Sequence, residues 1–365
     1  MKNRLQLFIV TMLLLLPQQS FGQQQTNGQP DSMKCKDTLV PAIPIKGRQV
    51  IIKSNFLPVS GEANIEINNN FLLYKNNKES IRLINLTTSK VVSRLGKFLG
   101  EPNAVYFSPS ILSSRVLSPL FYIEDGGLID EVTPAGKAVA TKSRIYSVDY
   151  EVEQHQANCS WDNYARFNSR CWLFVGSSKK GKERSLFKTY RNINGIQTSE
   201  LVDVSIDSTV NSWLQNLGWM ALKPGGNIVA YAYNYYHAIK FIDLSTMKSF
   251  LVATNLKNDL KKVAIKALEK FDGTPIVYYT KCYAGIKYLY CLYQGLSYNN
   301  IEAKGYRTPS YLEQYDWNGK LVHRYKLDKC CYKFCVNEET GKAYFVVWRN
   351  KAGASPIYEY DIDID

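Results

Sequence analysis

The C-terminal part of the chain, residues 287–365, alternates short apolar strands with tight turns and leaves almost no room for a helix. Asp316-Trp-Asn-Gly319 is one such turn, because Asn-Gly readily takes the positive φ that hairpin turns need. Short antiparallel strands that continue for this long must close on themselves, or they expose unpaired edges. The closed arrangement expected at this size is a β-propeller.

The rest of the chain follows the same pattern from residue 49 onward, in units of about fifty residues, the period typical of propeller blades. One segment differs, because apolar residues recur at helical spacing from Leu260 to Phe271, with lysines on the opposite face. Asn258 is placed to cap this helix and Gly273 to end it. We therefore predict an all-β, six-bladed propeller over residues 49–365 with one inserted amphipathic helix.

The N-terminus has the three regions of a secretion signal. Lys2 and Arg4 are followed by an apolar run that is too short to span a bilayer, and small residues precede the expected cleavage after Gly22. We predict a signal peptide at residues 1–22 and a polar, disordered spacer at 23–48. Cys35 lacks the context of a lipoprotein signal, so we expect export to the periplasm or outside the cell, without a lipid anchor or a transmembrane segment.

The net charge is +13, which favours anionic partners such as lipopolysaccharide, acidic glycans or membrane surfaces. The alternative is that the excess lysines only keep the protein soluble. Because export removes the chain from nucleic acid, we expect an envelope protein or an anionic glycan as partner, and no nucleic acid.

Eight cysteines and an oxidising compartment make disulfides possible, but they allow 105 connectivities. Cys159 and Cys171 flank a polar loop and are our first disulfide candidates. Cys282 and Cys291 lie on neighbouring predicted strands and are the second pair. The remaining cysteines lack metal-ligand spacing, so we predict no metal site.

Searches for catalytic patterns are negative. The three histidines, His155, His237 and His323, show no metal-ligand spacing. The chain has no nucleophile elbow, no P-loop and no dinucleotide-binding glycine pattern. We therefore assign no catalytic residue and expect no cofactor.

Twenty-six tyrosines are the unusual feature of the composition. Tyr235, Tyr236 and His237 end one predicted strand, and Trp213 and Trp219 flank a short polar segment. Aromatic rings at a rim bind sugars by stacking, so these five residues are our candidate binding residues. The alternative is that their rings fill the space between blades.

Several segments resemble, in order and spacing, the TolB-like six-bladed propeller family of Gram-negative envelope proteins. These are Ile81-Arg-Leu-Ile-Asn-Leu86, Tyr288-Leu-Tyr-Cys-Leu-Tyr-Gln-Gly295, Tyr315-Asp-Trp-Asn-Gly-Lys320 and Ile357-Tyr-Glu-Tyr360. The resemblance implies the propeller fold and carries no catalytic signature.

Three functions remain open from the sequence. The first is non-catalytic binding of a ligand, such as a glycan, or of a protein. The second is an enzyme acting on glycans or peptides at the central channel, and the third is an envelope assembly scaffold. A carboxylate-and-histidine cluster at a channel mouth favours the enzyme, and a bare aromatic groove favours glycan binding.

Overall fold

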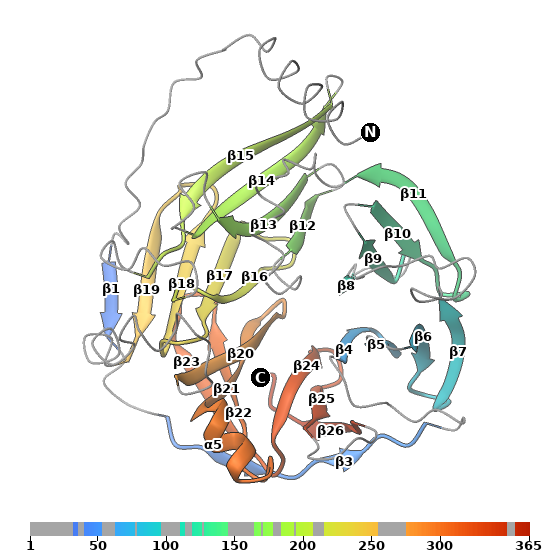
Figure 1. Ribbon diagram of the computed structural model, residues 1–365, viewed down its shortest axis with the longest axis vertical. Coiled ribbons are helices and arrows are strands. Elements are labelled where there is room, and N and C mark those ends of the chain that lie inside the picture. The colour runs from blue at the N-terminus through green and yellow to red at the C-terminus, as the bar shows by residue number, and fades with distance from the viewer. Residues whose placement is uncertain are drawn as a thin grey trace, which may run out of the picture.

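A computed structural model gives the arrangement of the chain as six β-sheets around a central axis (Figure 1). It describes residues 32–35, 40–52, 63–76, 79–95, 110–113, 119–125, 128–144, 164–168, 171–177, 184–192, 195–206, 215–254, 275–348 and 355–365. The predicted all-β, six-bladed propeller is confirmed.

Each blade has four antiparallel strands, and in blades one to five these strands follow in sequence order. Blade one is β4 (Asn64–Asn68), β5 (Phe71–Asn76), β6 (Glu79–Asn85) and β7 (Lys90–Leu95), and blade two is β8 (Ser110–Ser113), β9 (Phe121–Asp125), β10 (Leu128–Val132) and β11 (Ala138–Arg144). Blade three is β12 (Tyr164–Asn168), β13 (Cys171–Ser177), β14 (Arg184–Asn192) and β15 (Gly195–Asp203), and blade four is β16 (Gly218–Leu222), β17 (Ile228–Tyr233), β18 (Ala238–Asp243) and β19 (Ser249–Ala253). Blade five is β20 (Ile276–Ala284), β21 (Tyr288–Ser297), β22 (Tyr311–Asp316) and β23 (Leu321–Leu327), and blade six is β24 (Cys331–Asn337), β25 (Lys342–Val347), β26 (Ile357–Asp361) and β3 (Arg48–Gln49).

The first strand of each blade lies innermost. The inner strands β16 and β20, β20 and β24, and β24 and β4 contact one another around the axis (Figure 1). Side chains on these strands are therefore the ones closest to the centre of the ring.

The ring is closed by the N-terminal part of the chain. β3 pairs antiparallel with β26, with Gln49 opposite Tyr358, and the Val50 amide donates to the Ile357 carbonyl at 2.9 Å. Gly47 packs so closely on Tyr360 that a Cβ there would overlap the ring. Asp328 joins the two by accepting from the Gly47 amide and the Tyr360 hydroxyl, at 3.1 and 2.7 Å.

The predicted disordered spacer at residues 23–48 is wrong for residues 32–35, which form a strand, and for residues 40–48, which contain β2 (Ile43–Ile45) and the start of β3. β2 pairs parallel with β23 at the outer edge of blade five, and β1 (Ser32–Cys35) pairs parallel with β19 of blade four. A strand added to an existing sheet edge is held by main-chain hydrogen bonds. A polar segment can therefore be ordered in this way without an apolar face. The predicted signal peptide lies outside the described residues.

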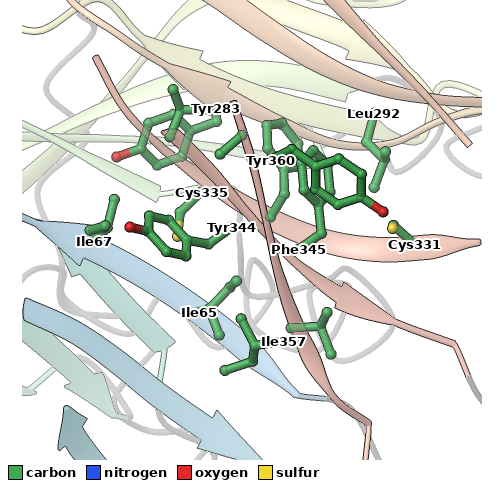
Figure 2. Packing of buried hydrophobic residues seen from close by; sticks show 14 of the residues in the cluster. Ile65, Ile67, Tyr283, Leu292, Cys331, Cys335, Tyr344, Phe345, Ile357 and Tyr360 are labelled. Carbon is green, nitrogen blue, oxygen red and sulfur yellow. The ribbon is translucent and has the colours of Figure 1, made fainter. Parts of the chain in front are cut away.

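The largest apolar core lies where blades five, six and one meet (Figure 2). Phe345 stacks on Phe334 with ring centroids 5.4 Å apart, and Tyr360 meets Phe345 edge-on at 5.2 Å. Aromatic pairs of this kind add to the stabilisation that burial of their area gives. Many of the tyrosines add to this packing, since eight in the described part of the chain are fully buried: Tyr74, Tyr231, Tyr233, Tyr236, Tyr279, Tyr290, Tyr315 and Tyr360.

The predicted amphipathic helix, between Leu260 and Phe271, lies outside the described residues. Within them the one α-helix is α5 (Tyr298–Ala303), in the connection between β21 and β22. It begins after Ser297, whose side chain accepts a hydrogen bond from the Asn300 amide, the usual role of an N-cap serine.

Blades three and four are joined by a buried lysine. Lys240 on β18 is 1% exposed, and its ammonium group donates to the main-chain carbonyls of Asp203 and Ser205 at 2.8 and 3.4 Å. Burial lowers the pKa of Lys240 to about 8, although Asp203 acts in the opposite direction. The folded-state pKa is therefore below that of the unfolded chain.

This difference predicts that Lys240 makes stability rise with pH. Between about pH 8 and the ordinary lysine pKa of 10.5, the unfolded chain binds more protons than the folded protein, so the free energy of unfolding increases through that window. From about pH 7 to about pH 10 we expect wild type to gain roughly 2 to 3 kcal/mol relative to Lys240→Met. Urea unfolding of both proteins measures the gain. Parallel pH profiles of the two proteins would contradict it.

Candidate binding site

The four candidate binding residues that the structure describes do not form one site. Trp213 lies outside the described residues. Tyr235 and Tyr236 are buried in the apolar cluster between blades three and four, the packing alternative considered above. Trp219 and His237 are also largely buried, but each contacts a polar network between blades four and five.

The disulfide candidates are buried where they are described. Cys282 lies directly opposite Cys291 in the β20–β21 pair, as predicted, and its thiol donates to the Trp219 carbonyl at 3.0 Å. Cys171 is the first residue of β13, and its proposed partner Cys159 lies outside the described residues. Both disulfides stay predictions.

The polar network is centred on Glu313 of β22, a carboxylate with no exposed surface. Its Oε2 atom accepts hydrogen bonds from the hydroxyls of Tyr279 and Tyr315 at 2.9 and 2.6 Å. The Nε2 atom of His237, in the turn before β18, lies 3.4 Å from the same oxygen. On the other side, Arg324 of β23 places its Nε atom 3.2 Å from Oε1.

Two tyrosine hydroxyls remain donors in this network. Burial, followed by the charge of Glu313, raises the pKa of Tyr279 and of Tyr315 well above the ordinary value for a phenol. Both hydroxyls therefore keep their protons at neutral pH and hold the buried carboxylate by charge-assisted hydrogen bonds. The network fixes the carboxylate between hydroxyl donors and a guanidinium group.

Three further tyrosines cover the network at the surface, and we call Tyr278, Tyr293 and Tyr311 the tyrosine row. All three are partly exposed, and neighbouring ring centroids are 6.0 Å apart along the row. The Arg324 guanidinium lies 5.0 Å from the centroid of Tyr293 and 4.4 Å from that of Tyr311. His237 stacks parallel to Tyr278, with centroids 5.7 Å apart.

Strand register explains why these rings gather at one end of blade five. Tyr293 of β21 lies opposite Tyr311 of β22 and, on its other side, opposite Tyr279 of β20. The β20–β21 register shifts between Val277 and Tyr279, so Tyr278 falls in a bulge. A bulge lets consecutive side chains turn toward the same side of a sheet, and both Tyr278 and Tyr279 contact the His237 ring.

Sequence reasoning found His237 but missed the tyrosine row, Glu313 and Arg324. One signal was available, because Tyr311, Glu313 and Tyr315 alternate along one strand and so share a face. A glutamate between two tyrosines on a buried face needs a hydrogen-bonding partner. The partner, His237, comes from the neighbouring blade. Strand alternation alone does not indicate which residue of that blade contacts Glu313.

The Glu313–His237 pair lies between blades four and five. Glu313 is on the third strand of its blade, His237 precedes the third strand of the neighbouring blade, and Tyr279 of the inner strand β20 donates to the same carboxylate. A carboxylate-and-histidine cluster at a channel mouth is the arrangement that favours the enzyme hypothesis. Among the described residues, histidine, cysteine and carboxylate side chains do not gather in a set of three suited to a metal ion.

The sheets, their closure and this polar network define a six-bladed propeller with an aromatic, polar surface between two blades. The predicted resemblance is confirmed, because residues 213–339 match the family described as TolB-like 6-blade propeller-like. The matched range contains the whole tyrosine row, Glu313 and Arg324. A search of curated protein sequences finds no match.

Solved structures show the same fold. An exported-protein candidate from Bacteroides fragilis NCTC 9343 superposes with a TM-score of 0.53 at 10% identity, over 91% of this chain and 99% of that chain. A member of the DUF4221 family from Bacteroides vulgatus superposes with a TM-score of 0.53 at 9% identity, over 88% of this chain and 96% of that chain. In the described ranges, no helix has the length and apolar character needed to cross a membrane.

Proposed function

We propose that this protein is an exported, non-catalytic propeller that binds a saccharide carrying an acidic group at the tyrosine row. The observation that carries the proposal is Arg324, whose guanidinium is held by buried Glu313 and lies against two partly exposed tyrosine rings. Export is supported by the predicted signal peptide and by the similarity to the exported-protein candidate from Bacteroides.

The chemistry of the row fits such a ligand. Tyrosine faces stack on the apolar faces of sugar rings, and their hydroxyls add hydrogen bonds. The guanidinium fork pairs with a carboxylate or sulfate through two parallel hydrogen bonds. Arg324 meets Glu313 through Nε, and the edge formed by its two terminal nitrogens, Nη1 and Nη2, is opposite Nε within the same planar group. The site therefore combines a stacking surface with one preorganised cation.

Binding to an array of acidic and neutral glycans, followed by calorimetry with the best ligand, tests this proposal. We expect Tyr293→Ala to weaken binding by about fivefold or more, because one lost stacking contact corresponds to roughly 1 kcal/mol or more. Arg324→Lys keeps a cation beside Glu313 but removes the fork, so the preference for acidic over neutral sugars should fall. Tyr288→Ala is the matched control, since Tyr288 is a partly buried tyrosine at the opposite end of the same strand.

Two results would count against the proposal. One is an array without any saccharide ligand for the folded protein. The other is equal loss of affinity in Tyr293→Ala and Tyr288→Ala, which would show that the row makes no specific contact. Melting temperatures of all three variants establish that each one is folded.

A further inference from the structure

A second group of aromatic side chains lies where blades five and six meet. Tyr306 is in the connection from α5 to β22, and its ring stacks on Trp348, directly after β25, with centroids 5.2 Å apart and an angle of 15° between the planes. Tyr332 of β24 also contacts the Trp348 ring, at 4.5 Å. Tyr332 is buried, whereas Tyr306 and Trp348 are partly exposed. We call Tyr306 and Trp348 the stacked pair.

The backbone at Tyr306 is strained. Its φ is 56°, in the left-handed region that a residue with a large side chain seldom adopts. Gly305 before it has φ 59°, and the amides of Gly305 and Tyr306 donate to the carbonyls of Glu302 and Ile301 at 2.7 and 3.0 Å, which ends α5. Glycine or asparagine adopts this conformation at lower cost. Because strain of this kind concentrates at ligand-binding sites, a tyrosine at this position points to a use for its ring.

A buried polar network connects the stacked pair to the tyrosine row. The Gln294 side chain donates to the Cys331 carbonyl at 2.6 Å, and the Ser310 hydroxyl accepts from the Cys331 amide at 2.8 Å and donates to Gln294 at 3.1 Å. All three residues are at most 4% exposed. Their immediate neighbours in the chain are Tyr293, Tyr311 and Tyr332. The network therefore holds the two aromatic groups at fixed positions relative to each other.

The two groups are close enough for one ligand to reach both. Tyr306 and Tyr311 are five residues apart in the chain, so their Cα atoms are at most about 18 Å apart. The connection between α5 and β22 carries Lys304 and Arg307 as exposed cations, while the exposed carboxylate of this region is that of Glu302 in α5. The excess of positive charge beside Tyr306 favours a ligand with acidic groups.

We propose that the acidic saccharide bound at the tyrosine row is an oligosaccharide whose chain continues past the end of blade five and stacks on the stacked pair. This inference rests on the proposed function and adds the length of the ligand to it. The row binds an acidic sugar through Arg324, and the stacked pair binds a sugar further along the same chain through its rings. The second contact forms within a complex that the first already holds, so a longer chain gains affinity.

Calorimetry with uronic-acid oligomers from alginate and pectin, compared with the disaccharide of each, tests this inference. We expect wild type to bind the oligomers about fivefold more tightly or better, the effect of one additional stacking contact. Tyr306→Asn removes the ring where the backbone suits asparagine, so it should fold, lose this gain and bind the disaccharides as wild type does. Tyr358→Ala changes a partly exposed tyrosine of β26 and should keep the gain. Equal affinity of wild type for oligomer and disaccharide, or an undiminished gain in Tyr306→Asn, would overturn the inference.

Hydroxyl-radical footprinting of wild type separates failure of this inference from failure of the proposed function. We expect the oligomers to reduce oxidation of Tyr306, Trp348 and Tyr293 severalfold, and the disaccharides to protect Tyr293 without the stacked pair. Protection of Tyr293 alone by the oligomers rejects this inference and leaves the proposed function standing. Protection of the stacked pair without Tyr293 rejects the tyrosine row, and with it a chain that spans both groups. Protection of neither group rejects both proposals.

Discussion

Deletion of residues 357–365 is expected to abolish cooperative unfolding of the propeller. These residues contain β26, which lies between β25 and the closing strand β3. Removing β26 exposes the edge of β25 and leaves β3 without a partner, so the ring loses its closure. The deletion also removes Ile357 and Tyr360 from the core shown in Figure 2, and each large apolar side chain lost from a core costs about 2 to 5 kcal/mol. The sum approaches the whole stability of an ordinary domain.

Thermal unfolding followed by near-ultraviolet circular dichroism measures this effect. A protein that begins at residue 38 is the control, because this truncation removes β1, an added strand at the edge of a complete sheet. We expect that control to melt cooperatively and within a few degrees of the full mature chain. If the C-terminal deletion melts like the control, β26 is not part of the closure.

The hairpin turns are the part of the fold that could be predicted most directly from the sequence. The Asp316–Gly319 turn forms as expected, with Gly319 at φ 84° and its amide bonded to the Asp316 carbonyl at 3.0 Å. The Gly341 turn is similar, with φ 63°. Positive φ at these positions favours glycine strongly, so the sequence pattern is nearly sufficient to place the hairpins. The hairpins then determine the antiparallel blades.

Contacts between blades were much harder to predict. His237 of blade four contacts Glu313 of blade five, and Lys333 of blade six lies against the ring of Trp219 of blade four. Such contacts depend on how the sheets twist and pack, which alternation along one strand does not specify. The bulge at Tyr278 adds a further shift, because one extra residue reverses which side chains face the neighbour. This explains why His237 was found without its partners.

Glu338 makes another contact between blades that sequence patterns do not indicate. Glu338, in the β24–β25 turn of blade six, reaches the β20–β21 turn of blade five. Its carboxylate accepts from the main-chain amides of Ile286, Lys287 and Tyr288, at 2.6, 3.1 and 3.1 Å. It also accepts from the Tyr290 hydroxyl at 3.1 Å. Gly285 has no side chain, which lets the carboxylate approach, since a Cβ there would collide with it.

Glu338→Ala is expected to lower the free energy of unfolding by about 3 kcal/mol. Hydrogen bonds to a charged acceptor contribute about 1.5 to 3 kcal/mol each, but water partly replaces them in a half-buried turn. Glu338→Gln should cost less, because the amide oxygen still accepts while the charge is lost. Glu339→Ala is the matched control, since Glu339 is the exposed neighbour in the same turn and should change stability by less than about 0.5 kcal/mol.

Urea unfolding of the three variants distinguishes a link between blades from an ordinary turn. Because Glu338 connects blades five and six, its removal should loosen the β20–β21 turn as well as the β24–β25 turn. Amide hydrogen exchange should therefore accelerate at Ile286, Lys287 and Tyr288, whose amides lose their acceptor. Unchanged exchange at these amides, together with a loss of stability no larger than that of Glu339→Ala, would show that the carboxylate does not join the blades.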